Sequence, residues 1–126
     1  MDNGAGWDAR APGLRIEQFA GPGYRGCRLA GEIDFTSAGP VQATLTAMML
    51  PGGGVVLADL SRVTFIDSSG LGVLVQAHRT ALEQDTRLLV VTSPPVRSLL
   101  ALTALDTILE THDDLAAAEA AVGAAR

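Results

Sequence analysis

Two serines follow an aspartate at the sharpest change of pattern in the chain, in the tetrapeptide at residues 67–70 (DSSG). An unbroken apolar run, residues 55–58, lies upstream, and apolar residues return at helical spacing from Leu71. Aspartate and serine are favoured at helix starts because their side-chain oxygens accept the free backbone N–H groups of the first turn. The pattern therefore predicts a strand, a short polar turn and a helix, with two hydroxyl groups at or near the surface where the helix begins.

Nucleophilic catalysis is one chemistry that these hydroxyl groups suggest, but the rest of the sequence argues against it. A serine hydrolase needs a base positioned beside its nucleophile, and the pattern Gly-x-Ser-x-Gly is absent. His78 is predicted roughly 15 Å along the helix from Ser68 by the helical rise, and His112 lies near the C-terminal helix. We therefore expect no catalytic residues, no metal and no cofactor. No spacing typical of a metal site or an acid–base pair relates the remaining carboxylates near this segment, Glu32, Asp59 and Asp67.

Composition and charge restrict the class of protein further. The chain has 126 residues, 48% of them hydrophobic, which suits one domain with its own core. The formal net charge is −5, and all nine basic residues are arginines dispersed along the sequence. This balance argues against nucleic acid or an anionic membrane as the main partner and leaves protein partners open. A single cysteine, Cys27, excludes an intramolecular disulfide and is expected in the core.

Targeting signals are not predicted. No apolar run approaches the ~18 residues of a membrane span, so membrane insertion is not expected. The first residues lack the positive start and apolar centre of a secretory signal, and the cytoplasm is the expected location. Residues 1–13, which include Trp7, are predicted to form a flexible N-terminal tail.

Alternation and turn residues predict the elements of a single domain over residues 14–122. Strands at residues 14–19 and 24–30 flank Gly21-Pro22-Gly23 and form a leading hairpin. A helix capped by Ser37 or Thr36 follows and runs to about residue 50, before a glycine-rich loop. Further strands are expected at residues 55–58, 88–91 and 107–110, and further helices at residues 71–82 and 93–102 and after Asp113 and Asp114.

Strands that alternate with helices predict an α/β fold with right-handed crossovers. The expected architecture is a mixed, mostly parallel sheet of about five strands, with the leading hairpin at one side and about four helices around it.

Three blocks of the sequence, in this order, resemble the STAS domain, named after sulphate transporters and anti-sigma factor antagonists. They are residues 31–34 (GEID), residues 60–75 (LSRVTFIDSSGLGVLV) and residues 93–100 (SPPVRSLL). The resemblance runs from about Leu14 to Glu110. The Asp-Ser-Ser-Gly-Leu-Gly segment is its specific part, and the other two blocks support it through their order.

The resemblance implies a function, since freestanding bacterial members of this size are mostly anti-sigma factor antagonists. In that family the unphosphorylated antagonist binds an anti-sigma factor that is also an ATP-dependent serine kinase, and this binding frees a sigma factor. The kinase phosphorylates one serine of the motif and ends the binding, and a separate serine phosphatase restores it. Carried over by position, the phosphorylated residue is Ser68, the serine directly after Asp67.

The helix that follows Ser68 is expected to carry the docking face. Helical spacing predicts an inward stripe of Leu71, Leu74, Val75, His78 and Leu82. Val73 lies off that stripe, and Asp34 is either part of the docking edge or simply a turn residue at a helix entry. The residues expected to contact the anti-sigma factor are Asp34, Asp67, Ser69, Gly70, Gly72, Val73 and Gln76.

Two alternatives stay open at this point. The first is that residues 67–70 are only a helix cap, although one hydroxyl can cap while the other accepts phosphate. The second is a STAS binding subunit of a membrane transport complex, such as a lipid transporter, which needs the fold but no phosphorylated serine. An intact Ser68 and the lack of a membrane segment favour the regulatory switch.

Overall fold

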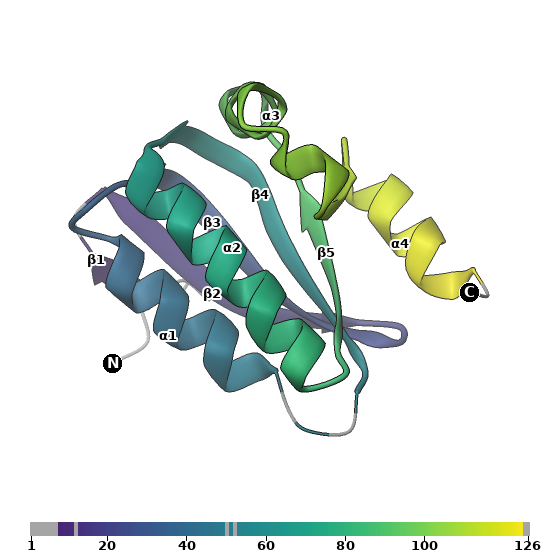
Figure 1. Cartoon of the computed structure of the whole chain (residues 1–126). Coiled ribbons are helices and arrows are strands. Elements are labelled where there is room, and N and C mark those ends of the chain that lie inside the picture. Colours follow the sequence, from purple (N-terminus) through teal and green to yellow (C-terminus); the bar gives the residue numbers. More distant parts are fainter. Residues whose placement is uncertain (1–7, 12, 50, 52, 125–126) are drawn as a thin grey trace.

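The chain folds around one six-stranded sheet, seen in a computed structural model that describes residues 8–11, 13–49, 51 and 53–124 (Figure 1). The strands lie side by side in chain order, the first three antiparallel and β3 to β6 parallel. A leading hairpin and a mixed, mostly parallel sheet are therefore confirmed. The strands are β1 (Asp8–Ala11), β2 (Leu14–Gly21), β3 (Tyr24–Ile33), β4 (Val55–Ile66), β5 (Arg87–Val91) and β6 (Glu110–His112).

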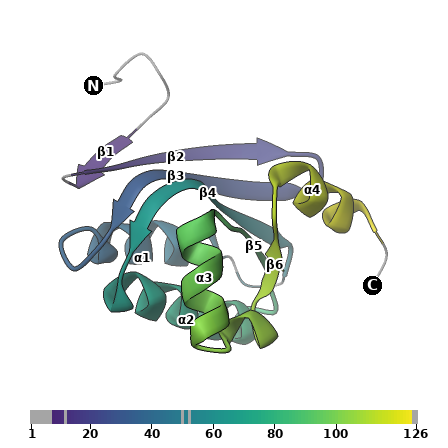
Figure 2. The same cartoon turned by 90° about the horizontal axis from the view of Figure 1, so that it is seen from above.

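Helices cover the two faces of the sheet unequally. Three of them lie on one face and α4 lies on the other (Figure 2). Each parallel pair of strands is joined by a helical crossover, as the alternating pattern predicts. The helices are α1 (Ala38–Met48), α2 (Ser68–Glu83), α3 (Pro94–Leu102) and α4 (Leu115–Gly123), with a 3₁₀ turn, η1 (Leu105–Thr107), before β6.

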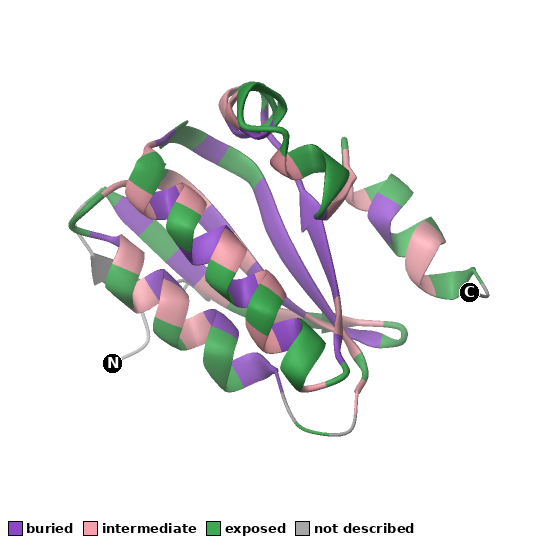
Figure 3. Cartoon of the chain, in the orientation of Figure 1, coloured by how far each residue is buried: buried purple, intermediate pink, exposed green. Residues whose placement is uncertain are grey.

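Two apolar clusters hold these layers together, and buried residues line the faces where helices meet the sheet (Figure 3). The larger cluster lies under α1, α2 and α3 and includes Cys27, as expected. The smaller cluster joins Tyr24, Leu57 and Leu89 to Ala118 of α4. Both faces of the sheet are covered at the first half of β4 and at β5, and residues 55–58 and 88–91 accordingly form unbroken apolar runs.

The N-terminal boundary differs from the prediction. Residues 8–11 form β1 and pair with β2, in the register Asp8↔Ile16 and Ala11↔Leu14. The expectation of a flexible tail over residues 1–13 is therefore wrong for this segment, and the sheet has one strand more than expected. Trp7 lies outside the described residues.

The C-terminal strand is also displaced. The strand predicted at residues 107–110 is replaced by η1 and by β6, which begins at Glu110. Ala104 before η1 has a left-handed backbone with φ of 60°, which ends α3 and turns the chain. Among the described residues, no helix is long and apolar enough to cross a membrane.

Candidate functional site

Ser68 lies at the junction of β4 and α2, where the sequence predicts a helix start. Asp67 is the N-cap residue, with extended backbone, and its Oδ1 accepts hydrogen bonds from the N–H of Ser69 (2.8 Å) and of Gly70 (3.3 Å). The cap is thus made by the carboxylate and does not need either serine hydroxyl. Ser68 is the first helical residue and its side chain is exposed.

Gly70 brings the start of α2 against the ends of β3 and β4. A β-carbon at this position would lie 2.7 Å from Ile66 Cγ1 and 2.9 Å from Ile33 Cγ2, so only glycine allows this approach. Gly70 is buried, which corrects its prediction as a partner contact. Its role is to set the position of the helix that carries Ser68.

The face of α2 that meets the core is rotated from the prediction by about one residue, roughly 100°. Val73 is 5% exposed and belongs to the main core, so its prediction as a docking residue is wrong. Leu82, predicted inward, is 69% exposed. Packing explains this rotation, because the small buried residues Gly70, Ala77 and Ala81 let the helix lie close to the sheet and to α1. The buried residues of α2 are Gly70, Val73, Leu74, Ala77 and Ala81.

The turn after β3 lies at the same edge of the sheet as Ser68. The N–H of Asp67 donates to the carbonyl of Ile33 (3.2 Å), which ties the ends of β3 and β4 together. Asp34 Oδ1 accepts from the backbone N–H of Thr36 (2.9 Å) and from its hydroxyl (2.7 Å). These hydrogen bonds from Thr36 hold the pKa of the Asp34 carboxyl below its usual value, so it stays ionised.

Ser37 occupies the predicted N-cap position of α1, but its side chain makes no capping hydrogen bond to the helix. Its buried hydroxyl instead donates to the carbonyl of Glu32 (3.0 Å) and accepts from the N–H of Asp34 (2.9 Å). The side chain therefore fastens the turn to the end of β3. The predicted contacts Asp34, Asp67, Ser69, Gly72 and Gln76 all retain some exposure.

Two aromatic side chains at this edge were missed by the sequence reasoning. Phe35 is 82% exposed in the turn after β3, and Phe65 is 47% exposed near the end of β4. The structure explains the exposure of Phe65, because Ile66 is buried against the helices and consecutive residues of a strand point to opposite faces, so that Phe65 faces away from α2.

The carboxylates of Asp34 and Asp67 make the surroundings of Ser68 negatively charged. Among the described residues, no arginine forms an ion pair with Asp34 or Asp67. A second negative group on Ser68 would therefore meet like charge from Asp67. The arginines pair elsewhere, Arg28 with Glu17 and Asp59, Arg87 with Glu110, and Arg97 with Asp113.

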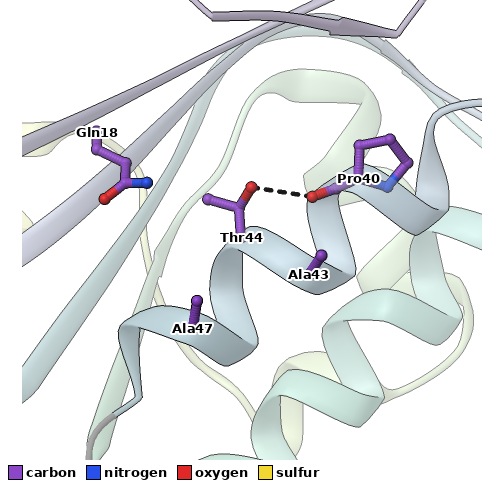
Figure 4. A pocket seen from close by; sticks show the side chains of 5 residues that line it. All are labelled: Gln18, Pro40, Ala43, Thr44 and Ala47. Atoms are coloured by element: carbon purple, nitrogen blue, oxygen red, sulfur yellow. Dashed lines mark hydrogen bonds between the residues drawn. The ribbon is translucent and has the colours of Figure 1, made fainter.

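A groove between β2 and α1 is separate from this edge (Figure 4). It has a volume of about 420 Å³ and is lined by Gln18, Pro40, Ala43, Thr44 and Ala47. None of these side chains is titratable or nucleophilic enough for catalysis without a base. Within the described part of the chain, no three histidine, cysteine, aspartate or glutamate residues group as metal ligands.

Comparisons with known proteins agree with the fold. The STAS domain family model matches residues 22–118. The anti-sigma-B factor antagonist of Listeria monocytogenes is 34% identical over 83 residues, which are 65% of this chain and 73% of that protein.

Solved structures show the same architecture. The crystal structure of an anti-sigma factor antagonist from Mycobacterium paratuberculosis has a TM-score of 0.74 and 25% identity, over 86% of this chain and 93% of that chain. The anti-sigma factor antagonist SpoIIAA, solved in its unphosphorylated form, has a TM-score of 0.64 and 21% identity, over 88% of this chain and 99% of that chain. This last likeness concerns the fold alone. With a family match over most of the sheet and its helices, the chain belongs to the STAS domain family.

Proposed function

We propose that this protein is an anti-sigma factor antagonist that docks on an anti-sigma factor through the edge carrying Ser68, and that phosphorylation of Ser68 ends the docking. Its relative in Listeria carries the name anti-sigma-B factor antagonist, and its structural neighbour in Mycobacterium carries the name anti-sigma factor antagonist. The observation that carries the proposal is the exposed position of Ser68 at the start of α2, beside a cap that Asp67 alone completes.

The covalent step fits the surroundings of this hydroxyl. Ser68 Oγ attacks the γ-phosphorus of ATP, the bond from that phosphorus to the ADP oxygen breaks, and the hydroxyl proton passes to a base of the kinase. Gly72, one turn along α2 from Ser68, has no side chain to hinder the approach of the kinase, and it has open space around it. A serine phosphatase then hydrolyses the phosphoester and restores the hydroxyl.

The effect of the phosphate is electrostatic. A phosphoserine adds about −1.5 to −2 charges. The Asp67 carboxylate already accepts the N–H groups of Ser69 and Gly70, so the helix end offers the phosphate little compensation. In water this charge is solvated and the fold stays as it is. Inside a docked interface an uncompensated charge costs several kcal/mol, and even ~3 kcal/mol weakens binding about a hundredfold.

The proposed switch needs two protein partners and a cellular compartment that holds them. The protein partners are an anti-sigma factor with serine-kinase activity and a phosphatase specific for phospho-Ser68, and the switch works in the cytoplasm, where ATP and sigma factors meet. The protein itself acts by binding and not by catalysis, without direct contact to nucleic acid. The contact residues that the geometry supports are Asp34, Asp67, Ser69, Gly72 and Gln76.

The test is phosphorylation of the purified protein by the anti-sigma factor kinases of the source organism, assayed one by one with ATP. One kinase is expected to add a single phosphate, which fragmentation places on Ser68. Ser68→Ala abolishes the modification and keeps the affinity, whereas the matched variant Ser69→Ala is still modified. Modification only at another residue refutes the site.

Calorimetric titration tests the charge mechanism. The phosphorylated protein is expected to bind its kinase at least a hundredfold more weakly, and Ser68→Asp to shift binding in the same direction, while circular dichroism spectra stay unchanged. Equal affinity of both forms rejects the switch. Stable association with a transport protein, insensitive to Ser68→Asp, supports the transport-subunit alternative instead.

A further inference from the structure

Phe35 and Phe65 are exposed apolar side chains at the edge of the sheet that carries Ser68. The chain has three phenylalanines, and two of them are 82% and 47% exposed here, whereas the ring of Phe19 packs against Tyr24 and under Arg28. A single exposed apolar residue needs no explanation. Two exposed aromatic rings near one end of the sheet, in a chain with so few aromatic residues, call for one.

We infer that Phe35 and Phe65 are the apolar anchors of docking, and that they insert into apolar pockets of the anti-sigma factor that flank its site for Ser68. The inference rests on the function proposed above and adds to it the residues that supply most of the affinity. Aromatic residues are the commonest such anchors in protein interfaces because they bury a large area with few rotatable bonds.

The backbone geometry places the α-carbons of both phenylalanines within the reach of one interface. Phe65 precedes Ser68 by three residues, so their α-carbons lie within about 11 Å. Ile33 pairs with Ile66, and Phe35 and Ser68 each follow this pair by two residues. With neighbouring strands ~5 Å apart, Phe35 lies less than about 20 Å from Ser68. A standard interface covers ~800 Å² on each partner, a disc about 30 Å wide, which is wide enough to span the α-carbons of all three residues although Phe65 lies on the face of the sheet turned away from α2.

The turn that carries Phe35 is rigid, which favours binding. Asp34 Oδ1 is bonded to the N–H and the hydroxyl of Thr36, and the carbonyl of Asp34 accepts from the N–H of Ser37 (3.1 Å) and of Ala38 (3.0 Å). The backbone on both sides of the ring is therefore fixed before any partner arrives. An anchor on a fixed turn loses less conformational entropy on docking than one on a mobile loop.

The chain offers matched control residues away from this edge. Leu102 is 84% exposed at the end of α3, close to the value for Phe35, and Ile108 is 55% exposed after η1, close to the value for Phe65. The substitutions are Phe35→Ser with control Leu102→Ser, and Phe65→Thr with control Ile108→Thr. Threonine keeps the strand preference of β4.

The experiment titrates the anti-sigma factor kinase that phosphorylates the wild-type protein with each variant, in the presence of ADP. Each phenylalanine variant is expected to raise Kd at least tenfold, and the double variant about a hundredfold, while both controls stay within twofold. In phosphorylation assays the phenylalanine variants raise KM and leave kcat unchanged, because neither ring touches the reacting oxygen. Thermal melts confirm that all variants are folded.

Three outcomes overturn parts of this account separately. If the phenylalanine variants bind like their controls while the phosphorylated protein does not bind, the anchors are wrong and the proposed function stands. If no kinase binds the wild-type protein, the proposed function fails. If sedimentation shows a wild-type dimer that Phe35→Ser dissociates, the surface joins two copies of this chain and the inference is wrong.

Discussion

Gly70 lies against Ile66 with no space for a methyl group between them, since a β-carbon at Gly70 would come within 2.7 Å of Ile66 Cγ1. Ile33 closes the other side, with its Cγ2 at 2.9 Å and its carbonyl oxygen at 3.1 Å from the same point. The first turn of α2, which includes Ser68, thus takes its position from the ends of both central strands.

Gly70→Ala is expected to destabilise the protein by about 1–2 kcal/mol. Overpacking in a core costs typically 1–3 kcal/mol, and the gain in helix propensity offsets up to about 1 kcal/mol of this. Urea unfolding followed by circular dichroism measures the change. The matched variant is Gly72→Ala in the same helix, where nothing lies within 4 Å of the added carbon. It is expected to stabilise the protein by up to about 1 kcal/mol, and equal effects of the two variants contradict the packing account.

Asp67→Ala is expected to lower stability by about 1 kcal/mol, because two N–H groups at the start of α2 lose their acceptor. Asp67→Asn keeps a capping oxygen and is expected to recover most of the loss. Ser68→Ala is expected to change the free energy of unfolding by less than 0.5 kcal/mol, roughly the range of surface substitutions. A loss at Ser68 as large as that at Asp67 contradicts the assignment of the cap.

Stability is expected to fall at alkaline pH. Burial raises the pKa of the Cys27 thiol from 9.0 to about 12, and burial, followed by the hydrogen bond to Glu119, raises the pKa of Tyr24 from 10.0 to about 12. Both groups bind their protons more tightly in the folded state. Their stabilisation is therefore complete below pH 9 and is lost as the pH rises from 9 towards 12.

Midpoints of urea unfolding measured between about pH 8 and pH 11 check this expectation. This is roughly the range around the unperturbed pKa values of a thiol and a phenol. Cys27→Ala is less stable at neutral pH because it leaves a small void, but its stability falls less steeply above pH 9. The same thiol is expected to react with Ellman's reagent only in the unfolded protein. A midpoint independent of pH in this range is the contrary result.

Tyr24→Phe is expected to loosen α4 selectively. The Tyr24 hydroxyl donates to the Glu119 carboxylate, and Arg87 Nη1 donates to the carbonyl of Ala121 (3.1 Å), so two side chains of the sheet hold this helix. Ala118 is its one fully buried residue among those described. Hydrogen exchange of α4 amides is expected to speed up severalfold while α2 amides keep their rates. Uniform acceleration over both helices means that α4 unfolds only with the whole domain.

Local patterns predicted much of this fold. The hairpin followed from Gly21-Pro22-Gly23 between alternating strands, and the structure pairs Gly21 with Tyr24 directly. The doubly buried first half of β4 and β5 followed from the unbroken apolar runs at residues 55–58 and 88–91. The start of α2 followed from Asp67, whose carboxylate caps the helix as the residue type indicates.

Tertiary contacts decided what the patterns left open. Residues 8–11 carry no apolar alternation, and they form a strand only because β2 offers its backbone groups. The bulky residues of α2 predict the wrong buried side, because the small residues Gly70, Ala77 and Ala81 permit the close approach to the sheet. For the same reason the exposure of Phe35 and Phe65 became visible only with the neighbouring elements in place.

The pairing of β1 with β2 also bears on how this domain is to be handled as a polypeptide. A shortened chain that starts at Leu14, where alternation first becomes visible, leaves unpaired the backbone groups at the start of β2 that β1 pairs in the register Asp8↔Ile16 and Ala11↔Leu14. Unpaired groups of this kind recruit other chains and lead to aggregation. The four residues of β1 thus cover part of the outer edge of β2 and are expected to keep the domain soluble.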